Sequence, residues 1–272
     1  MRALREPYVR YLRLLGCETR PQGEEGFDDI VRRHVWRTPF ENISKLLLFA
    51  REGKGRIITL PEFLDGIEQQ DLGGTCYASN PYLARLLRAL GYDADLLGAD
   101  MSAPNIHTSI RVRIGPAAYH VDVGYGGPFH RGIRLDQLPH EIAHFGLRYV
   151  LDRDAEDTYR MSVYKGGERL HGYVVHGPPR SLKFFQPIVL GSYKPGQTFM
   201  TCLRIVRYFE GHSVELNDRT LSSYGVGGAS HRVLNSMAEL RSAVADGLAM
   251  PRCPIEEAVK ALEQITRKRL FE

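Results

Sequence analysis

The chain has 272 residues, 43% of them hydrophobic, and a formal net charge of +4. A chain of this length and apolar content can bury a large core. We expect neither a membrane span nor a signal peptide, because the sequence has no run of about eighteen apolar residues and no charged leader before an apolar stretch. The basic residues are spread along the chain rather than clustered with aromatic ones, which argues against nucleic-acid binding.

Residues 1–90 are predicted to be helical. Phe27 and Ile30, for example, recur at the spacing of one helix face. Four leucines repeat this spacing before a glycine ends the run: Leu83, Leu86, Leu87 and Leu90. Asn80 and Pro81 suit the N-cap and the first helical position of that helix.

Cys76 is the most informative residue of this region. It ends the segment Leu72-Gly73-Gly74-Thr75-Cys76, whose glycines allow a tight turn and leave the sulfur approachable. A thiol near a helix N-terminus faces unpaired backbone N–H groups, which favours the thiolate. Taken alone, the pattern also fits a buried structural cysteine.

Two strands that follow the cysteine bring candidate partners for it. Residues 107–114 alternate as a strand, and residues 119–123 form a second strand after a Gly-Pro turn. An antiparallel hairpin of the two sets His107 and Asp122 close together near one end. A cysteine on a helix with a histidine and an aspartate on a sheet is the layout of a nucleophile, a base and the group that orients the base. His120 is the rival base, because it lies on the same strand face as Asp122.

Residues 91–210 are predicted to be mostly strands and turns, and the chain then returns to helix. Strand patterns cover residues 147–151, 159–164 and 198–206. Helix patterns cover residues 237–248 and begin again at Pro254, where acidic residues occupy the first turn. Helices followed by a sheet, with no alternation of the two, predict an α+β fold.

The cysteines give no sign of a metal site. Cys17, Cys76, Cys202 and Cys253 are far apart and show no paired metal-ligand spacing. We therefore predict neither a zinc site nor a disulfide framework. A cytoplasmic location fits, because a reducing compartment keeps a reactive thiol free.

Four sequence blocks resemble those of the arylamine N-acetyltransferase family and occur in the same order. They are Arg37-Thr38-Pro39-Phe40-Glu41-Asn42, Gly73-Gly74-Thr75-Cys76 with Asn80 four residues later, His107 before its strand, and Asp122-Val123-Gly124-Tyr125-Gly126. Together they cover roughly residues 34–135. Beyond this stretch, only the length and the general plan are similar.

The resemblance implies an α+β fold with a cysteine-protease-like catalytic core. Residues 1–90 would form a helical bundle that carries the nucleophile. Residues 91–210 would form an antiparallel β-barrel that carries the histidine and the aspartate, and residues 211–272 an α/β lid.

The resemblance also implies an activity. The enzyme would move acetyl from acetyl-CoA, a co-substrate, to an arylamine, arylhydrazine or arylhydroxylamine by a ping-pong reaction, without a metal. Cys76 would be the nucleophile, His107 the base and Asp122 the orienting carboxylate. The expected contacts of the acyl donor are Gly124, Gly126 and Gly127.

Two charges that the family usually has around the nucleophile are missing. Leu72 stands where an arginine is usual, and Ala78 where a glutamate is usual. Glu41 is therefore left without its customary arginine, unless another such as Arg37 substitutes. If the helix begins at the cysteine, as in the family, Pro81 falls inside it and removes a backbone hydrogen bond.

Two alternatives remain open from the sequence. The chain can be an amide synthase of the same superfamily, which releases an acyl chain from an acyl-carrier protein as a macrolactam. It can also be a non-catalytic relative that binds aromatic ligands, since the missing charges fit a relaxed demand on the nucleophile.

Overall fold

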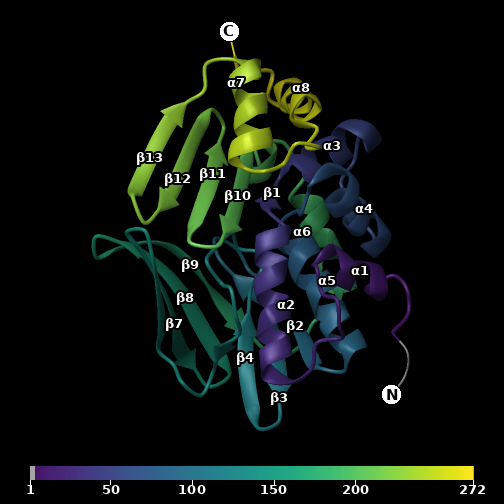
Figure 1. The fold of residues 1–272 in the computed structure, drawn as a ribbon, viewed down its shortest axis with the longest axis vertical. Coiled ribbons are helices and arrows are strands. Elements are labelled where there is room, and N and C mark those ends of the chain that lie inside the picture. Colours follow the sequence, from purple (N-terminus) through teal and green to yellow (C-terminus); the bar gives the residue numbers. More distant parts are fainter. Residues whose placement is uncertain (1–3, 272) are drawn as a thin grey trace. The chain divides into compact units, whose positions relative to one another are not determined.

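The computed structural model describes residues 4–271 and divides into two compact units (Figure 1). The first unit consists of the residues up to Val35 together with Ser79–Phe185, and the second of Trp36–Ala78 together with the residues from Gln186 onward. Helices and antiparallel strands occur in separate stretches of the chain, so the predicted α+β class is confirmed.

The first unit is built on an eight-stranded antiparallel sheet that forms a nearly closed barrel. Its strands in chain order are β2 (Asp93–Asp100), β3 (His107–Ile114), β4 (Ala117–Val121), β5 (Ile133–Arg134), β6 (His140–His144), β7 (Leu147–Ala155), β8 (Thr158–Lys165) and β9 (Glu168–His176). They are ordered β5-β4-β3-β2-β9-β8-β7-β6. The helical elements of this unit are α1 (Tyr8–Leu14), most of α2 (Gly23–Arg37), most of α5 (Cys76–Leu90) and the 3-10 turn η1 (Leu182–Phe185).

The predicted hairpin is present as strands β3 and β4. Ile110 pairs with Val121, and Ile114 pairs with Ala117 across the turn. Gly115 in that turn has φ +58°, a conformation that glycine adopts without strain. Asp122 directly follows β4. Because Val121 pairs with Ile110, Asp122 lies near the start of β3, where His107 is, and not at the hairpin tip.

The second unit combines helices with a five-stranded antiparallel sheet, ordered β1-β10-β11-β12-β13. Its strands are β1 (Phe40–Glu41), β10 (Arg204–Phe209), β11 (His212–Asn217), β12 (Thr220–Gly225) and β13 (Gly228–Val233). Its helices are α3 (Ile43–Glu52), α4 (Leu60–Gln70), α6 (Gln186–Gly191), α7 (Met237–Ser242) and α8 (Ile255–Thr266), with the short turns η2 (Thr198–Met200) and η3 (Ala243–Gly247).

Local sequence signals explain where the helices of the second unit begin. Helix α4 starts with a capping box, in which the Thr59 side chain accepts from the Glu62 N–H and the Glu62 carboxylate accepts from the Thr59 N–H. Helix α8 has Glu256 and Glu257 in its first turn, where the helix dipole favours acids, and buries Val259 and Leu262 on one face. The predicted C-terminal helices are thus confirmed.

Two expectations about local structure are wrong. Residues 198–206 were expected to be one strand, but they begin with η2, and β10 starts only at Arg204. The helix that carries the four leucines begins at Cys76 rather than at Asn80, so Pro81 lies inside α5 and Asn80 is not its N-cap. Asn80 is instead fully buried and used for tertiary hydrogen bonds, which outweigh the local preference of the Asn-Pro pair.

Within residues 4–271, no helix is both long and apolar enough to span a membrane.

Candidate active site

The loop that leads into Cys76 is shaped by its two glycines. A Cβ atom on Gly73 would lie 2.0 Å from the carbonyl oxygen of Pro39, so the main chains approach too closely for any side chain. Gly74 has φ +113°, which L-residues rarely adopt. Cys76 then begins α5 with 8% of its surface exposed. The sequence expectation of a tight turn at a helix N-terminus is confirmed.

Glu41 fastens this loop to strand β1. Its carboxylate accepts hydrogen bonds from the N–H of Ser44 at 2.8 Å and from the N–H of Gly73 at 3.2 Å. The main chain adds a bond from the Glu41 N–H to the Gly74 carbonyl, at 3.2 Å. Burial raises the pKa of Glu41 above its ordinary value, although these N–H donors oppose the rise. The glutamate therefore ties the loop before Cys76 to the sheet of the second unit.

Arg37 does not replace the arginine that Leu72 lacks. It donates to the Ile67 carbonyl at 2.7 Å and lies 3.9 Å from Asp71, whose closer partner is Arg252. Across residues 4–271, the ion pairs include none with Glu41. The suggested substitution by Arg37 is wrong, and backbone N–H groups serve this carboxylate instead.

In the first unit, His107 and Asp122 form a buried pair. His107 Nε2 lies 2.7 Å from Asp122 Oδ2, and each residue is at most 3% exposed. The neutral ring carries its proton on the nitrogen that meets the carboxylate, so Nδ1 keeps the lone pair. This is the arrangement of a base held by an acid, with its reactive nitrogen on the other side of the ring.

Asn80 completes this cluster from helix α5. Its amide donates to Asp122 Oδ1 at 2.9 Å and to the Thr108 carbonyl, and its oxygen accepts from the Val123 N–H at 2.9 Å. The side chain thus joins α5 to both strands of the hairpin. From the sequence, Asn80 was identified only as part of the matched cysteine block and as a candidate helix N-cap. Its tertiary hydrogen bonds were not predicted, because a buried amide leaves no periodic pattern in the sequence. It lies one turn after Cys76 on the same helix.

The Asp122 carboxylate is held in its ionised form. Burial alone would raise its pKa, but His107 and the amide of Asn80 outweigh burial, so the pKa lies below its ordinary value. The Gly124 N–H adds a further hydrogen bond to Oδ1, at 3.0 Å. An ionised carboxylate in this position stabilises an imidazolium on its neighbour.

His120, the rival base, binds a different group. Its Nε2 lies 3.0 Å from the hydroxyl of Tyr173, and burial together with the negative charge of Asp122 raises the pKa of that hydroxyl well above its ordinary value. Complete burial lowers the pKa of His120 to about 4, so the ring is neutral at neutral pH. The Tyr173 ring also packs against His107, with ring centres 4.7 Å apart. Tyr173 was missed, because it comes from strand β9 far along the chain.

The three glycines predicted to contact the acyl donor also take part in local structure. Gly124 binds Asp122, and Gly126 has φ +75°. A Cβ atom on Gly127 would lie 2.6 Å from the ring of Phe129. These constraints explain the glycines at 126 and 127, whereas the backbone hydrogen bond of Gly124 does not require a glycine. The donor contacts of all three remain a prediction.

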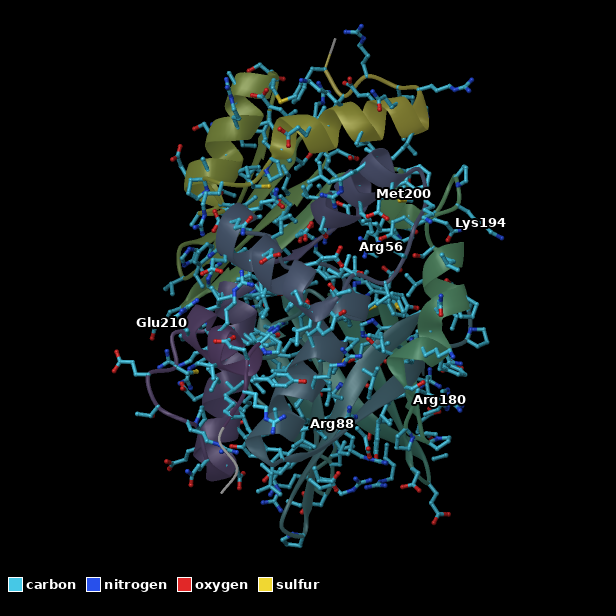
Figure 2. The ribbon with its side chains drawn as sticks, turned by 90° about the vertical axis from the view of Figure 1, so that its right-hand side faces the viewer. Arg56, Arg88, Arg180, Lys194, Met200 and Glu210 are labelled. Carbon is cyan, nitrogen blue, oxygen red and sulfur yellow. The ribbon has the colours of Figure 1, made fainter. Side chains whose placement is uncertain are left out.

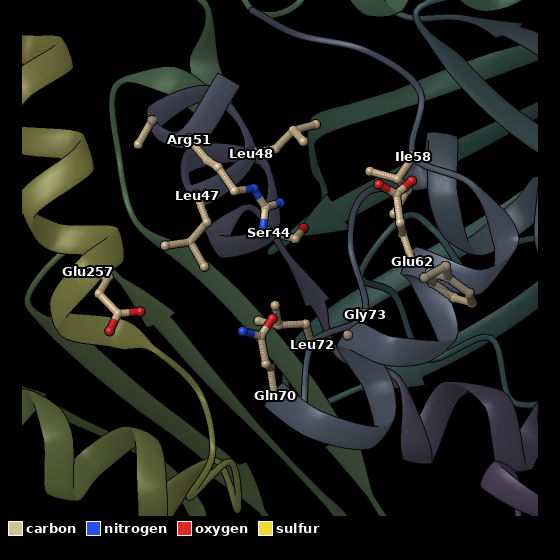
Figure 3. A pocket seen from close by; sticks show the side chains of 13 residues that line it. Ser44, Leu47, Leu48, Arg51, Ile58, Glu62, Gln70, Leu72, Gly73 and Glu257 are labelled. Carbon is tan, nitrogen blue, oxygen red and sulfur yellow. The ribbon is translucent and has the colours of Figure 1, made fainter. Parts of the chain in front are cut away.

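Leu72 and Ala78, which replace the two charges, line different cavities of the second unit. Leu72 lines a cavity of about 420 Å³ between α3 and α4, rimmed by Arg51, Glu62 and Glu257 (Figure 3). Ala78 lines a smaller cavity of about 40 Å³. The two positions therefore have different surroundings. Among residues 4–271, no group of three His, Cys, Asp or Glu side chains is arranged to hold a metal ion.

Comparisons with known proteins agree with the sequence blocks. A family model described as N-acetyltransferase matches residues 25–246. An arylamine N-acetyltransferase of Mycolicibacterium smegmatis is 26% identical over 252 residues, which are 86% of this chain and 88% of that protein. The pineal gland isozyme NAT-10 of Gallus gallus is 32% identical over 113 residues, which are 39% of this chain and only 37% of that relative.

A solved structure has the same fold. The arylamine N-acetyltransferase of Mycobacterium marinum in complex with CoA matches with a TM-score of 0.79 at 20% identity, over 95% of this chain and 99% of that one. At this identity the likeness concerns the fold, and it confirms the predicted combination of helices with an antiparallel barrel.

Proposed function

Because the family model covers most of its length, the chain belongs to the arylamine N-acetyltransferase family, and we propose that it carries acetyl from acetyl-CoA to an aromatic amine through a thioester on Cys76. The observation that supports this most is the cluster of His107, Asp122 and Asn80. Asn80, which supplies the amide of this cluster, belongs to the helix that begins at Cys76. A base, an orienting carboxylate and a thiol are the groups that this transfer requires.

In the first step, Cys76 becomes acetylated. Nδ1 of His107 takes the thiol proton, and the thiolate attacks the thioester carbonyl of acetyl-CoA. The bond from that carbon to the CoA sulfur then breaks, and the leaving thiolate receives the proton from the imidazolium. Asp122 stabilises the imidazolium meanwhile, and backbone N–H groups at the start of α5 stabilise the oxyanion.

In the second step, the acceptor nitrogen attacks the Cys76 thioester. The acceptor is an arylamine, arylhydrazine or arylhydroxylamine. Its proton passes through His107 to the departing thiolate of Cys76, which restores the free enzyme.

The exchange of one thioester for another in the first step is nearly neutral in energy, so the protein chiefly has to bind and orient the donor.

The donor assignment is supported by the relative from M. marinum, which was solved with CoA. Gly124, Gly126 and Gly127 are proposed to lie beside the acyl donor, since they come two to five residues after Asp122. A cytoplasmic location stays a prediction, made from the need for a reduced thiol.

The test is to incubate the protein with acetyl-CoA and to weigh it intact, before and after an arylamine is added. We expect a gain of one acetyl group that the amine removes. A gain seen only with an acyl chain loaded on a carrier protein supports amide synthesis instead. A protein that gains mass from neither donor contradicts both catalytic schemes and supports a binding role.

A further inference from the structure

Lys45 is a buried cation to which the proposed mechanism gives no role. It lies in the first turn of α3, three residues after Asn42 of the matched block, and only 8% of its surface is exposed. Lysine is almost never buried unless it is paired, because the ammonium loses its hydration. Its presence here therefore calls for a specific reason.

The ammonium of Lys45 is held in one place by neutral groups. Nζ donates to the carbonyl of Ser192 at 2.7 Å and to its hydroxyl at 2.8 Å. It also lies 4.6 Å from the centre of the Tyr193 ring, close enough for a cation–π interaction. These contacts fix the position of the charge but do not neutralise it.

No carboxylate compensates this charge. Among the ion pairs within residues 4–271, none involves Lys45. The other cation that lines the same cavity, Arg56, is labelled in Figure 2. It differs in this respect, because it is paired with Glu52 at 2.7 Å and with Glu62 at 2.5 Å. The charge of Lys45 is thus available to a group inside the cavity.

The cavity that Lys45 lines is also lined by the nucleophile loop. Gly74, Thr75 and Ala78, which flank Cys76, contribute to its walls. Its volume is only about 40 Å³, enough for about one water molecule. A charge fixed in the wall of so small a space lies close to the main chain on both sides of Cys76, and the electrostatic interaction between two charges grows as their separation falls.

We propose that Lys45 is a positioning residue whose ammonium stabilises the thiolate of Cys76 and takes over electrostatic support that the missing arginine at Leu72 would supply. The inference rests on the proposed role of Cys76 as nucleophile. In this account the thiolate of Cys76 is the counter-charge of the buried ammonium, and it is present whenever the thiol is ionised.

The titration of the cavity groups agrees with this role. Burial lowers the pKa of Lys45 to about 8, while the charge of Cys76 raises it. An interaction that favours the ammonium when the thiolate is present favours the thiolate equally when the ammonium is present. The other titratable groups that line this cavity, besides Arg56, are Tyr77 and Tyr193. Burial raises the pKa of both, so both stay neutral. Arg56 is already paired.

The test measures the alkylation of Cys76 by iodoacetamide as a function of pH, read on the peptide that contains this residue. In Lys45→Met, we expect the rate at pH 7 to fall about tenfold and the profile to move to higher pH. Lys45→Arg, which keeps the charge, should restore part of the rate. Arg56→Met is the matched control and should leave the profile unchanged, because its cation is already neutralised.

Thermal unfolding verifies that each variant is folded, and Lys45→Gln replaces Lys45→Met if the latter is not. An unchanged profile in a folded variant that lacks the lysine charge overturns the inference. An equal shift in Arg56→Met also overturns it, because the effect would then be that of general surface charge. The readout needs no acetyl-CoA, so failure of the acetyl-transfer proposal and failure of this inference are separate results.

Discussion

The surroundings of Cys76 and those of His107 are built by different means. His107 is held by charged and amide side chains, namely Asp122 and Asn80, in a fully buried cluster. The loop before Cys76 is held by its own backbone, through the close approach of Gly73 to Pro39 and N–H bonds to one carboxylate. The usual charged side chains next to the cysteine are absent.

The difference teaches that the two sides tolerate change differently. A base must be oriented and its charged form stabilised, so its neighbours have to be ionised or strongly polar. A nucleophile that begins a helix is placed by main-chain geometry, so neighbouring side chains can vary as long as the turn survives. The buried cation Lys45 fits this picture, since it comes from a separate helix.

The largest effect is expected from His107, the proposed base. His107→Gln removes the proton acceptor and should lower the rate of Cys76 acetylation by about a thousandfold. Stopped-flow measurement of CoA release over one turnover provides the rate. His120→Gln is the control and should keep most of the rate, because that ring contacts Tyr173 and not the reacting groups. Equal losses in both variants would show that the histidines act together.

Asp122→Asn should come close to the His107 loss in single-turnover rate, since an amide neither stabilises imidazolium nor fixes the correct tautomer. It also has a signature in stability. The pKa of Asp122 is lowered in the folded protein, so its ionised form stabilises the fold above the unfolded-state pKa, and this contribution disappears as pH falls through the folded-state value. Thermal midpoints at acidic pH should therefore depend less on pH in the variant than in the wild type. Identical slopes would contradict the assignment.

Gly73→Ala tests the backbone half of the comparison. Its Cβ would collide with a main-chain oxygen that cannot move away alone, so we expect about 3 kcal/mol of destabilisation, with a loss of acetylation. Gly191→Ala is a matched control, since nothing lies within 4 Å of its added Cβ. Chemical denaturation gives both values. A Gly73 variant as stable as this control would show that the loop is not fixed by close packing.

The smallest effect is expected from coupling between the two altered positions. Leu72→Arg and Ala78→Glu each place a charge in a buried position and should each destabilise by roughly 1–3 kcal/mol. Because the residues line different cavities, the double variant should equal the sum of the singles within about 0.5 kcal/mol. Chemical unfolding curves of the two single variants and the double variant measure whether their stability losses are additive. Recovery of stability in the double variant would mean that the positions do face each other.

Much of this arrangement is predictable from sequence, and the exceptions have physical reasons. The α+β class, the hairpin and the turn before Cys76 follow from periodicity and glycine chemistry, which are local. The sequence left the start of α5 open between Cys76 and Asn80, and the expected N-cap at Asn80 was wrong, because the tertiary hydrogen bonds of Asn80 override the local preference for a cap at Asn-Pro. Tyr173 and Lys45 escaped notice because their roles depend on contacts between segments distant in the sequence.

The most direct test of the account is to locate the acetyl group after one turnover without acceptor. Wild-type protein and Cys76→Ala are each mixed with acetyl-CoA, digested and mapped by mass spectrometry. The account predicts acetyl on the peptide with Cys76 in the wild type and no acetylated cysteine in the folded variant, because alanine costs little packing at this site. Acetyl on Cys17, Cys202 or Cys253, or undiminished labelling of Cys76→Ala, would contradict it.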